Sequence, residues 1–341
     1  MTTLAHQAET LKLARLLHTA PEQLDFVGRL DAAEVRALRE RATAALFDGD
    51  RHLFHRVAAA TKLLPAPIAA LIAEKALGPL LCARVAGLLP PERAVDIAKR
   101  LHTRFLADVC LELDPRHVRE LIAQMPVKRI VEVAHELAAR REYITMARFV
   151  DVLPEAAMRA TLDALQDDET LLRIGFFVEN PAQLSAVIQM LSEHRLSRLI
   201  RVSVEGAAEL WGEALALINA IDAPQRRLMA GLAAALDAPV LERMIGLTHE
   251  AELWTALLPV VAEMDDAARA RLTRLQSLNE DAVLAAMLRA VDAANLWPQL
   301  LPLVSRMDAT LQQRAVRVAE QQDAALLQRL DQALRRLAAG A

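Results

Sequence analysis

Two histidines near the N-terminus are the first candidates for chemistry. His52 and His55 lie three residues apart, and Asp48 and Asp50 precede them. Side chains at that spacing share one face of a helix and could present nitrogen and oxygen ligands to a metal ion. A complete site needs three or four converging ligands, and no others are recognisable. We therefore predict no metal and no cofactor, and we name His52 and His55 as the only metal candidates.

The motifs of the common enzyme classes are missing. His135-Glu136 begins like the helix of zinc proteases, but Ala139 occupies the place of the second histidine. The ten glycines form neither a phosphate-binding loop nor a nucleophile elbow. The acidic run 167–169 is typical of a helix N-terminus. We predict that the protein is not an enzyme and name no catalytic residue. An enzyme whose site is assembled from distant helices is the third hypothesis for the function.

The two cysteines, Cys82 and Cys110, both lie in apolar runs without a histidine at a meaningful spacing. Buried, reduced thiols are the interpretation that fits this setting.

The aromatic residues show the clearest order. Trp211, Trp254 and Trp297 are each 43 residues apart, and Tyr143 falls in the tryptophan position of an earlier, less regular unit. Equivalent positions of stacked repeats form a row. If that row lines a concave surface, Tyr143 and the three tryptophans form an aromatic binding strip. If it points between helical layers, they are core side chains, which is the default for recurring apolar positions.

The neighbours of the tryptophans repeat with the same period. A leucine precedes each one, and an aspartate follows eleven residues later: Asp222, Asp265 and Asp308. The middle unit predicts a tryptophan-bearing helix that ends at Met264-Asp265, a second helix over 267–276 and a third over 282–291. Two or three helices in about 40–47 residues are the signature of armadillo and HEAT repeats.

The composition agrees with a helical chain. Of the 341 residues, 54% are hydrophobic but only 3% are aromatic, which disfavours sandwiches and barrels. Prolines stand where first helical turns are expected, at Pro90, Pro115, Pro126, Pro154 and Pro181. The most apolar window, 63–89, is interrupted by prolines and charges. We predict a pair of buried helices there and no membrane span.

Together these patterns predict an all-α fold, a right-handed α-solenoid of short helices with repeats of about 43 residues in its C-terminal half. We expect an N-terminal helical cap over 1–50, irregular short-helix repeats over 51–206, and three regular repeats with a terminal cap over 207–341. No low-complexity linker interrupts the chain, so one continuous superhelix is expected.

Three segments carry a family resemblance: Leu88 to Ala94 (LLPPERA), Leu113 to Ile122 (LDPRHVRELI), and Leu153-Pro154-Glu155. They resemble the cytosolic N-terminal domain of MgtE-type magnesium transporters, whose short helices also form a superhelix. The resemblance spans 88–191 at most. It implies a superhelical fold and the docking of protein partners. The dense carboxylates that would bind magnesium are missing, so no functional residue is carried over.

The charge balance limits the classes of partner that the chain is expected to bind. Forty basic residues face 44 acidic ones, which disfavours a dedicated nucleic-acid binder. The stretch 51–148 is locally basic, with 16 Lys/Arg against 10 Asp/Glu, and suits either a solvated face or an anionic partner. We predict a cytoplasmic bacterial scaffold or adaptor that binds a protein partner. The alternative is a carrier or sensor that holds an apolar, lipid-like ligand in its groove.

Overall fold

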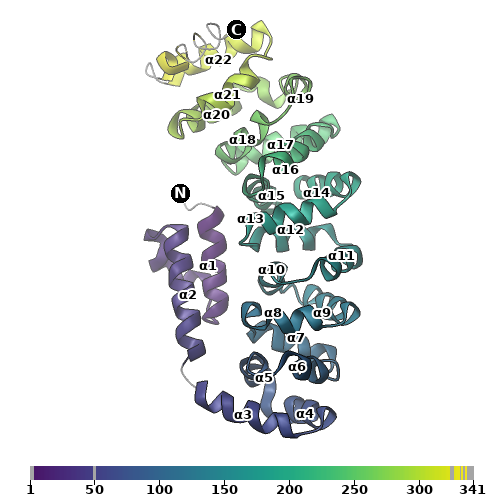
Figure 1. Cartoon of the computed structure of the whole chain (residues 1–341). Coiled ribbons are helices and arrows are strands. Elements are labelled where there is room, and N and C mark those ends of the chain that lie inside the picture. Colours follow the sequence, from purple (N-terminus) through teal and green to yellow (C-terminus); the bar gives the residue numbers. More distant parts are fainter. Residues whose placement is uncertain (1–3, 49–50, 323–325, 331, 333–334, 336–341) are drawn as a thin grey trace. The chain divides into compact units, whose positions relative to one another are not determined.

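A computed structural model describes residues 4–48, 51–322, 326–330, 332 and 335 of the chain. Every regular element in this described part is a helix, most of them short (Figure 1). This confirms the all-α prediction. The chain divides into two compact units, Met1–Gln183 and Leu184–Ala341. The start of the regular repeats, expected at residue 207, lies inside the second unit.

The first unit begins with a helical hairpin, which we call the N-terminal hairpin. It consists of α1 (Leu4–Leu16), the 3-10 helix η1 (Pro21–Arg29) and α2 (Ala32–Asp48). These elements pack mainly on one another. Their buried side chains form a small core of their own, made of Leu13, Ala14, Leu24, Val27 and Val35. The described residues 4–48 therefore form a helical module with an apolar interior of its own.

The rest of the first unit is a succession of short helices that pack on their second neighbours. In one row α3 contacts α5, which contacts α7, and α7 contacts α9, which contacts α11. In a second row α4, α6 and α8 follow one another in the same way. The bounds are α3 Arg51–Leu63, α4 Ala66–Ile72, η2 Ala73–Leu77, α5 Gly78–Ala86, α6 Pro91–Ala98, α7 Thr103–Glu112, η3 Pro115–Val118, α8 Arg119–Gln124, α9 Val127–Ala139, α10 Tyr143–Val150, α11 Glu155–Ala164 and α12 Asp168–Phe177.

Prolines and acidic caps start these helices as the sequence predicts. Pro90, Pro126 and Pro154 each stand immediately before a helix, where a missing N–H costs nothing. The Asp114 carboxylate accepts a hydrogen bond from the Arg116 backbone N–H at the start of η3. The Asp167 carboxylate caps α12 by accepting from two backbone N–H groups. The acidic run 167–169 is thus a helix N-terminus.

The helices of the second unit follow the 43-residue period through two full groups, and the third group follows it as far as the described residues extend. The tryptophan-bearing helices α15, α18 and α21 contact one another in series, as do α17 and α20. The bounds are α14 Glu193–Glu205, α15 Ala208–Ala220, α16 Ala223–Ala234, α17 Ala238–Glu250, α18 Trp254–Ala262, α19 Asp266–Leu272, η4 Ser277–Asn279, α20 Asp281–Ala293, α21 Trp297–Val304 and α22 Ala309–Gln322, with α13 (Pro181–Met190) across the unit boundary. The middle repeat has its three predicted helices, the second ending earlier than expected.

The recurring aspartates have one structural role. Asp222, Asp265 and Asp308 each precede a helix and accept a hydrogen bond from the backbone N–H three residues later, at 3.1, 2.7 and 2.8 Å. This is the geometry of an N-cap, which satisfies one of the four unpaired N–H groups of a helix start. The 43-residue period of the sequence is therefore also a period of helix starts.

The apolar window 63–89 differs from its prediction. Its helices α4, η2 and α5 form a run, Ala66–Ala86, that is long and apolar enough to cross a membrane by length and composition, and 28% of that window is buried. The expected pair of buried helices is wrong for four of the large apolar side chains: Leu63, Ile68, Leu71 and Leu80 are exposed. For Ile68 and Leu71 the physical reason is that α4 packs through its alanines, Ala66, Ala69 and Ala70.

Candidate binding site

The three tryptophans lie in the core of the second unit. Trp211, Trp254 and Trp297 are 1%, 3% and 9% exposed. The Trp211 indole N–H donates a hydrogen bond to the Thr248 hydroxyl at 2.8 Å, and that hydroxyl donates to the Met244 carbonyl. Such positions are typical of side chains between helical layers. Binding by the aromatic row stays a prediction, and buried indoles offer little area to a large partner.

Trp254 lacks the hydrogen bond that Trp211 makes. Its indole nitrogen is buried and has no partner among the described residues. The position equivalent to Thr248, 43 residues later, is Val291, which has no hydroxyl to offer and is 0% exposed. The repeat thus keeps the tryptophan but not its acceptor, and a polar group that stays unpaired in a core costs stability.

Tyr143 belongs to the first unit and is partly buried at the first position of α10. The turn that precedes Tyr143 has the same geometry as the turns that precede two of the tryptophans. Arg141, Glu252 and Asn295 each stand two residues before the aromatic residue and adopt a positive φ of 54–58°. After each one, a backbone N–H returns to a carbonyl five residues earlier, at 2.8–3.0 Å. This is the Schellman pattern of a helix C-terminus, and it supports the placement of Tyr143 in the tryptophan register.

The remaining candidates from the sequence are scattered. His55 is exposed on α3, whereas the side chains of His52 and Asp48 and all of Asp50 lie outside the described part. No group of three metal-ligating side chains forms among the residues that the structure describes. Cys82 and Cys110 are free thiols, the first partly buried and the second buried. Burial raises their pKa values to about 11 and about 12, so both stay protonated and unreactive at neutral pH.

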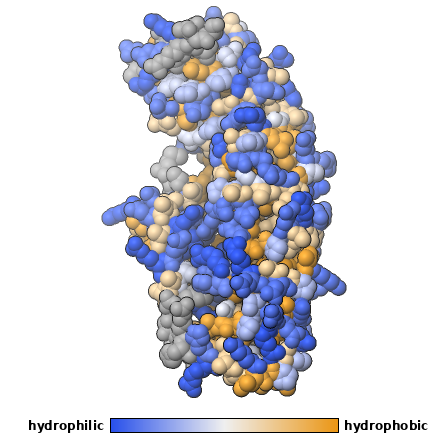
Figure 2. Space-filling view, in the orientation of Figure 1, coloured by the Kyte–Doolittle hydropathy of each residue, from blue (hydrophilic) through white to orange (hydrophobic). Residues whose placement is uncertain are grey.

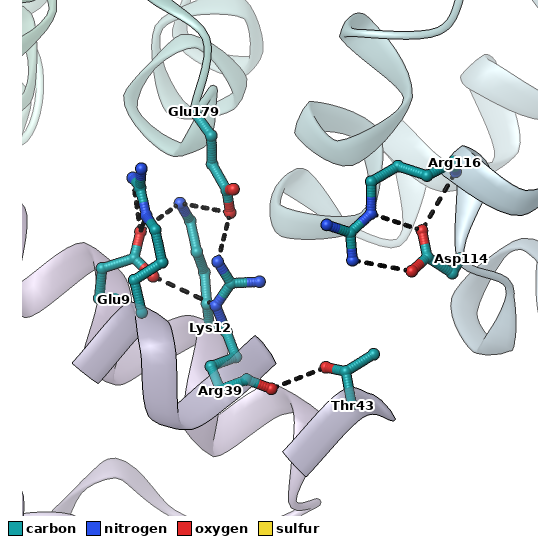
Figure 3. Close-up of polar contacts among 8 residues, drawn as sticks. Glu9, Lys12, Arg39, Thr43, Asp114, Arg116 and Glu179 are labelled. Atoms are coloured by element: carbon teal, nitrogen blue, oxygen red, sulfur yellow. Dashed lines mark hydrogen bonds and ion pairs between the residues drawn. The ribbon is translucent and has the colours of Figure 1, made fainter. Parts of the chain in front are cut away.

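A charged cluster links the N-terminal hairpin to the rest of the first unit (Figure 3). Its centre is Glu9, whose side chain is 3% exposed and forms ion pairs with Lys12 at 2.9 Å and with Arg36 and Arg39 at 3.1 Å. Lys12 and Arg39 also bind Glu179, at 3.2 and 2.8 Å. Glu179 follows α12, so this contact joins residues far apart in the sequence. Three cations thus share two carboxylates.

A second contact ties the hairpin to α10. The Arg15 guanidinium, in the last turn of α1, donates to the Glu142 carboxylate at 3.0 Å. Figure 3 also draws a second ion pair, to the right of Glu179. In this pair the Arg116 guanidinium donates to both carboxylate oxygens of Asp114. The groups near the hairpin in the first unit therefore include charges of both signs.

The pKa shifts follow from this arrangement. Burial alone would raise the pKa of Glu9, but the charges of Lys12, Arg39 and Arg36 outweigh burial and lower it below its ordinary value. The pKa of Asp114 is lowered in the same way, since hydrogen bonds from Arg116 outweigh its burial. Both carboxylates are therefore ionised at neutral pH and hold their partners by charge.

Asp151 behaves in the opposite way. Burial, followed by the charge of Glu179, raises the pKa of Asp151, and one of its carboxylate oxygens is buried with no partner among the described residues. It also stands directly after α10, where the helix dipole disfavours a negative charge.

Sequence reasoning did not find the charged cluster. Lys12 and Glu179 are 167 residues apart, and no local pattern distinguishes them from solvated charges. The one available signal was the mixed charge of α1 and α2. The cluster consists of ion pairs within the first unit, and they hold the N-terminal hairpin against Glu179.

Comparison with protein-family models, curated proteins and solved structures found no match for this chain.

Proposed function

We propose that this chain is a non-enzymatic α-solenoid that serves as a cytoplasmic scaffold or adaptor for protein partners. Support comes from the succession of helices that pack on their second neighbours in the first unit and from the equivalent helices α15, α18 and α21 that contact one another in the second. A repeat array of this kind presents an extended surface rather than a closed pocket, and its usual role is to bind other proteins.

The charged cluster is the observation that carries the proposal. The N-terminal hairpin has its own core, and the ion pairs with Glu179 and Glu142 tie it to the remainder of the unit. Partly exposed ion pairs such as Arg15–Glu142 contribute only about 0–1 kcal/mol each. The pairs of Lys12 and Arg39 with Glu179 are more buried, so only a partner helix that offers the same charges can replace the hairpin. The proposed site is the face that the hairpin covers, and the hairpin competes for it.

A charge-reversal cycle on the full chain tests this proposal. Arg15→Glu and Glu142→Arg each place like charges opposite one another, whereas the double variant restores an ion pair with its direction reversed. We expect each single variant to speed amide hydrogen exchange in α1 and α2 and to increase, several-fold, the amount of one protein partner captured from native cells. The double variant is expected to return both quantities toward those of the unmodified chain.

The control is Arg159→Glu on α11. Arg159 pairs with Glu155 at 2.9 Å within that helix, so this substitution changes charge by the same amount without touching the hairpin. Equal partner capture by all five proteins would show that the hairpin does not compete. Capture of no protein by any of them would contradict the scaffold proposal itself.

A further inference from the structure

The first helices of the two rows in the first unit expose a surface that is both aliphatic and basic. We call it the α3–α5 surface and define it by four aliphatic and three basic side chains, all exposed: Leu63, Ile68, Leu71, Leu80, Arg56, Lys62 and Lys75. Leu63 is 87% exposed and Leu71 is 59% exposed. Figure 2 shows hydrophobic atoms at the end of the first unit where α3 and α4 lie. Isolated exposed leucines are common, but a group on adjoining helices marks an interaction site.

Helix α4 is packed in the reverse of the usual order. Its small side chains Ala66, Ala69 and Ala70 are buried, while the larger Ile68 and Leu71 point to solvent. Burial of a leucine stabilises a fold far more than burial of an alanine, so folding alone would favour the opposite arrangement. The arrangement makes sense if the large side chains are buried against something outside the chain.

The charge on this surface has one sign. From residue 54 to residue 86 the sequence holds four Lys/Arg and a single acidic residue, Glu74. Glu74 is turned to its own unit, where its carboxylate accepts from the His102 backbone N–H at 2.6 Å and from the His102 ring at 2.8 Å. Lys62 and Lys75 form no ion pair within the described ranges, so their positive charge faces solvent.

We propose that the α3–α5 surface docks on an anionic membrane surface, with Leu63, Ile68 and Leu71 in the headgroup region and Lys62 and Lys75 on the lipid phosphates. Aliphatic side chains flanked by lysine and arginine are the composition of interfacial, membrane-bound helices. A symmetric contact with a second copy would bring the same lysines face to face, which disfavours it. The surface also lacks the exposed tryptophan and tyrosine that anchor most protein interfaces.

Sedimentation of the full chain with lipid vesicles tests the proposal. The probes are vesicles of phosphatidylglycerol and phosphatidylcholine in equal parts, and vesicles of phosphatidylcholine alone. We expect binding to the first and little to the second, with binding weakened by salt. Ile68→Ser with Leu71→Ser should reduce binding at least tenfold, because two aliphatic side chains no longer enter the headgroup region. Lys62→Glu with Lys75→Glu should also reduce binding at least tenfold, since one basic residue near an anionic surface changes affinity about fivefold.

Matched controls come from elsewhere in the same unit. Val127 and Lys128 on α9 are also exposed, so Val127→Ser with Lys128→Glu removes one aliphatic and one basic group away from the α3–α5 surface. This variant should bind like the unmodified chain, and unchanged circular dichroism should show that all variants fold. No binding to anionic vesicles, or equal loss in the α9 control, overturns the proposal. The proposal is also overturned if the chain does not bind vesicles but associates with itself, and if Leu71→Ser abolishes that self-association. This result would assign the surface to a second copy.

Discussion

At the residue scale, one hydroxyl separates two otherwise equivalent tryptophans. Thr248 accepts the indole hydrogen bond of Trp211, and in the next repeat Val291 leaves Trp254 without an acceptor. The helices α17 and α20 that carry these two residues have the same length and register, and each contacts the tryptophan helix of its own repeat. The difference is therefore confined to one side chain.

Val291→Thr is expected to supply the missing acceptor and to raise the free energy of unfolding by about 1 kcal/mol, the net value of one hydrogen bond. The matched change, Thr248→Val, should lower it by about 1–3 kcal/mol because it leaves the Trp211 indole unpaired. Urea denaturation of both variants measures the two effects. If Val291→Thr destabilises the chain as much as Thr248→Val does, the two sites are not equivalent.

Asp151 gives a pH-dependent prediction at the same scale. Because burial raises the pKa of this carboxyl in the folded chain, its ionised form costs stability above that pKa, and the cost disappears as pH falls and the group is protonated. Asp151→Asn removes a negative charge from the C-terminus of α10, a gain of about 0.3–1 kcal/mol near pH 7. We expect the gain to vanish near pH 3. A gain of equal size at both pH values, or the same gain from Asp151→Glu, would contradict this explanation.

At the scale of the element, the sequence carried most of the information. The period of 43 residues located Asp222, Asp265 and Asp308, and the structure shows each as an N-cap. The same register holds a contact that the sequence did not reveal. The Arg226 and Arg269 guanidinium groups, four residues after their aspartates, donate to carbonyls at the end of the preceding helix. The sequence around each of these arginines predicts a solvated side chain, so only the structure identifies their role.

Trp254→Ala tests whether the aromatic row is a core element. Since Trp254 is almost fully buried at the start of α18, its truncation should lower the free energy of unfolding by about 3–5 kcal/mol. Partner capture should be unchanged at temperatures where the variant remains folded. Thermal unfolding followed by circular dichroism measures the first effect, and Trp254→Phe serves as a milder control. Intact stability with lost partner binding would instead support an aromatic binding strip.

At the scale of the whole molecule, sequence reasoning predicted the helical class and the regular repeats but not the contacts between distant segments. Local spacing specifies where helices start and which side is apolar. It does not specify that Lys12 meets Glu179, or that α4 turns its alanines inward and leaves Leu71 exposed. Both features depend on which helix packs against which, and no periodic pattern encodes this choice for the irregular helices of the first unit.

We propose that this chain works by holding another protein. Native mass spectrometry of the chain purified from its own cells tests it most directly. We predict a species whose mass equals the chain plus one protein partner, and a larger share of that species in Arg15→Glu than in the unmodified chain. A chain that carries only a lipid-sized mass, with no protein partner in either form, would contradict the claim and favour a carrier of apolar ligands.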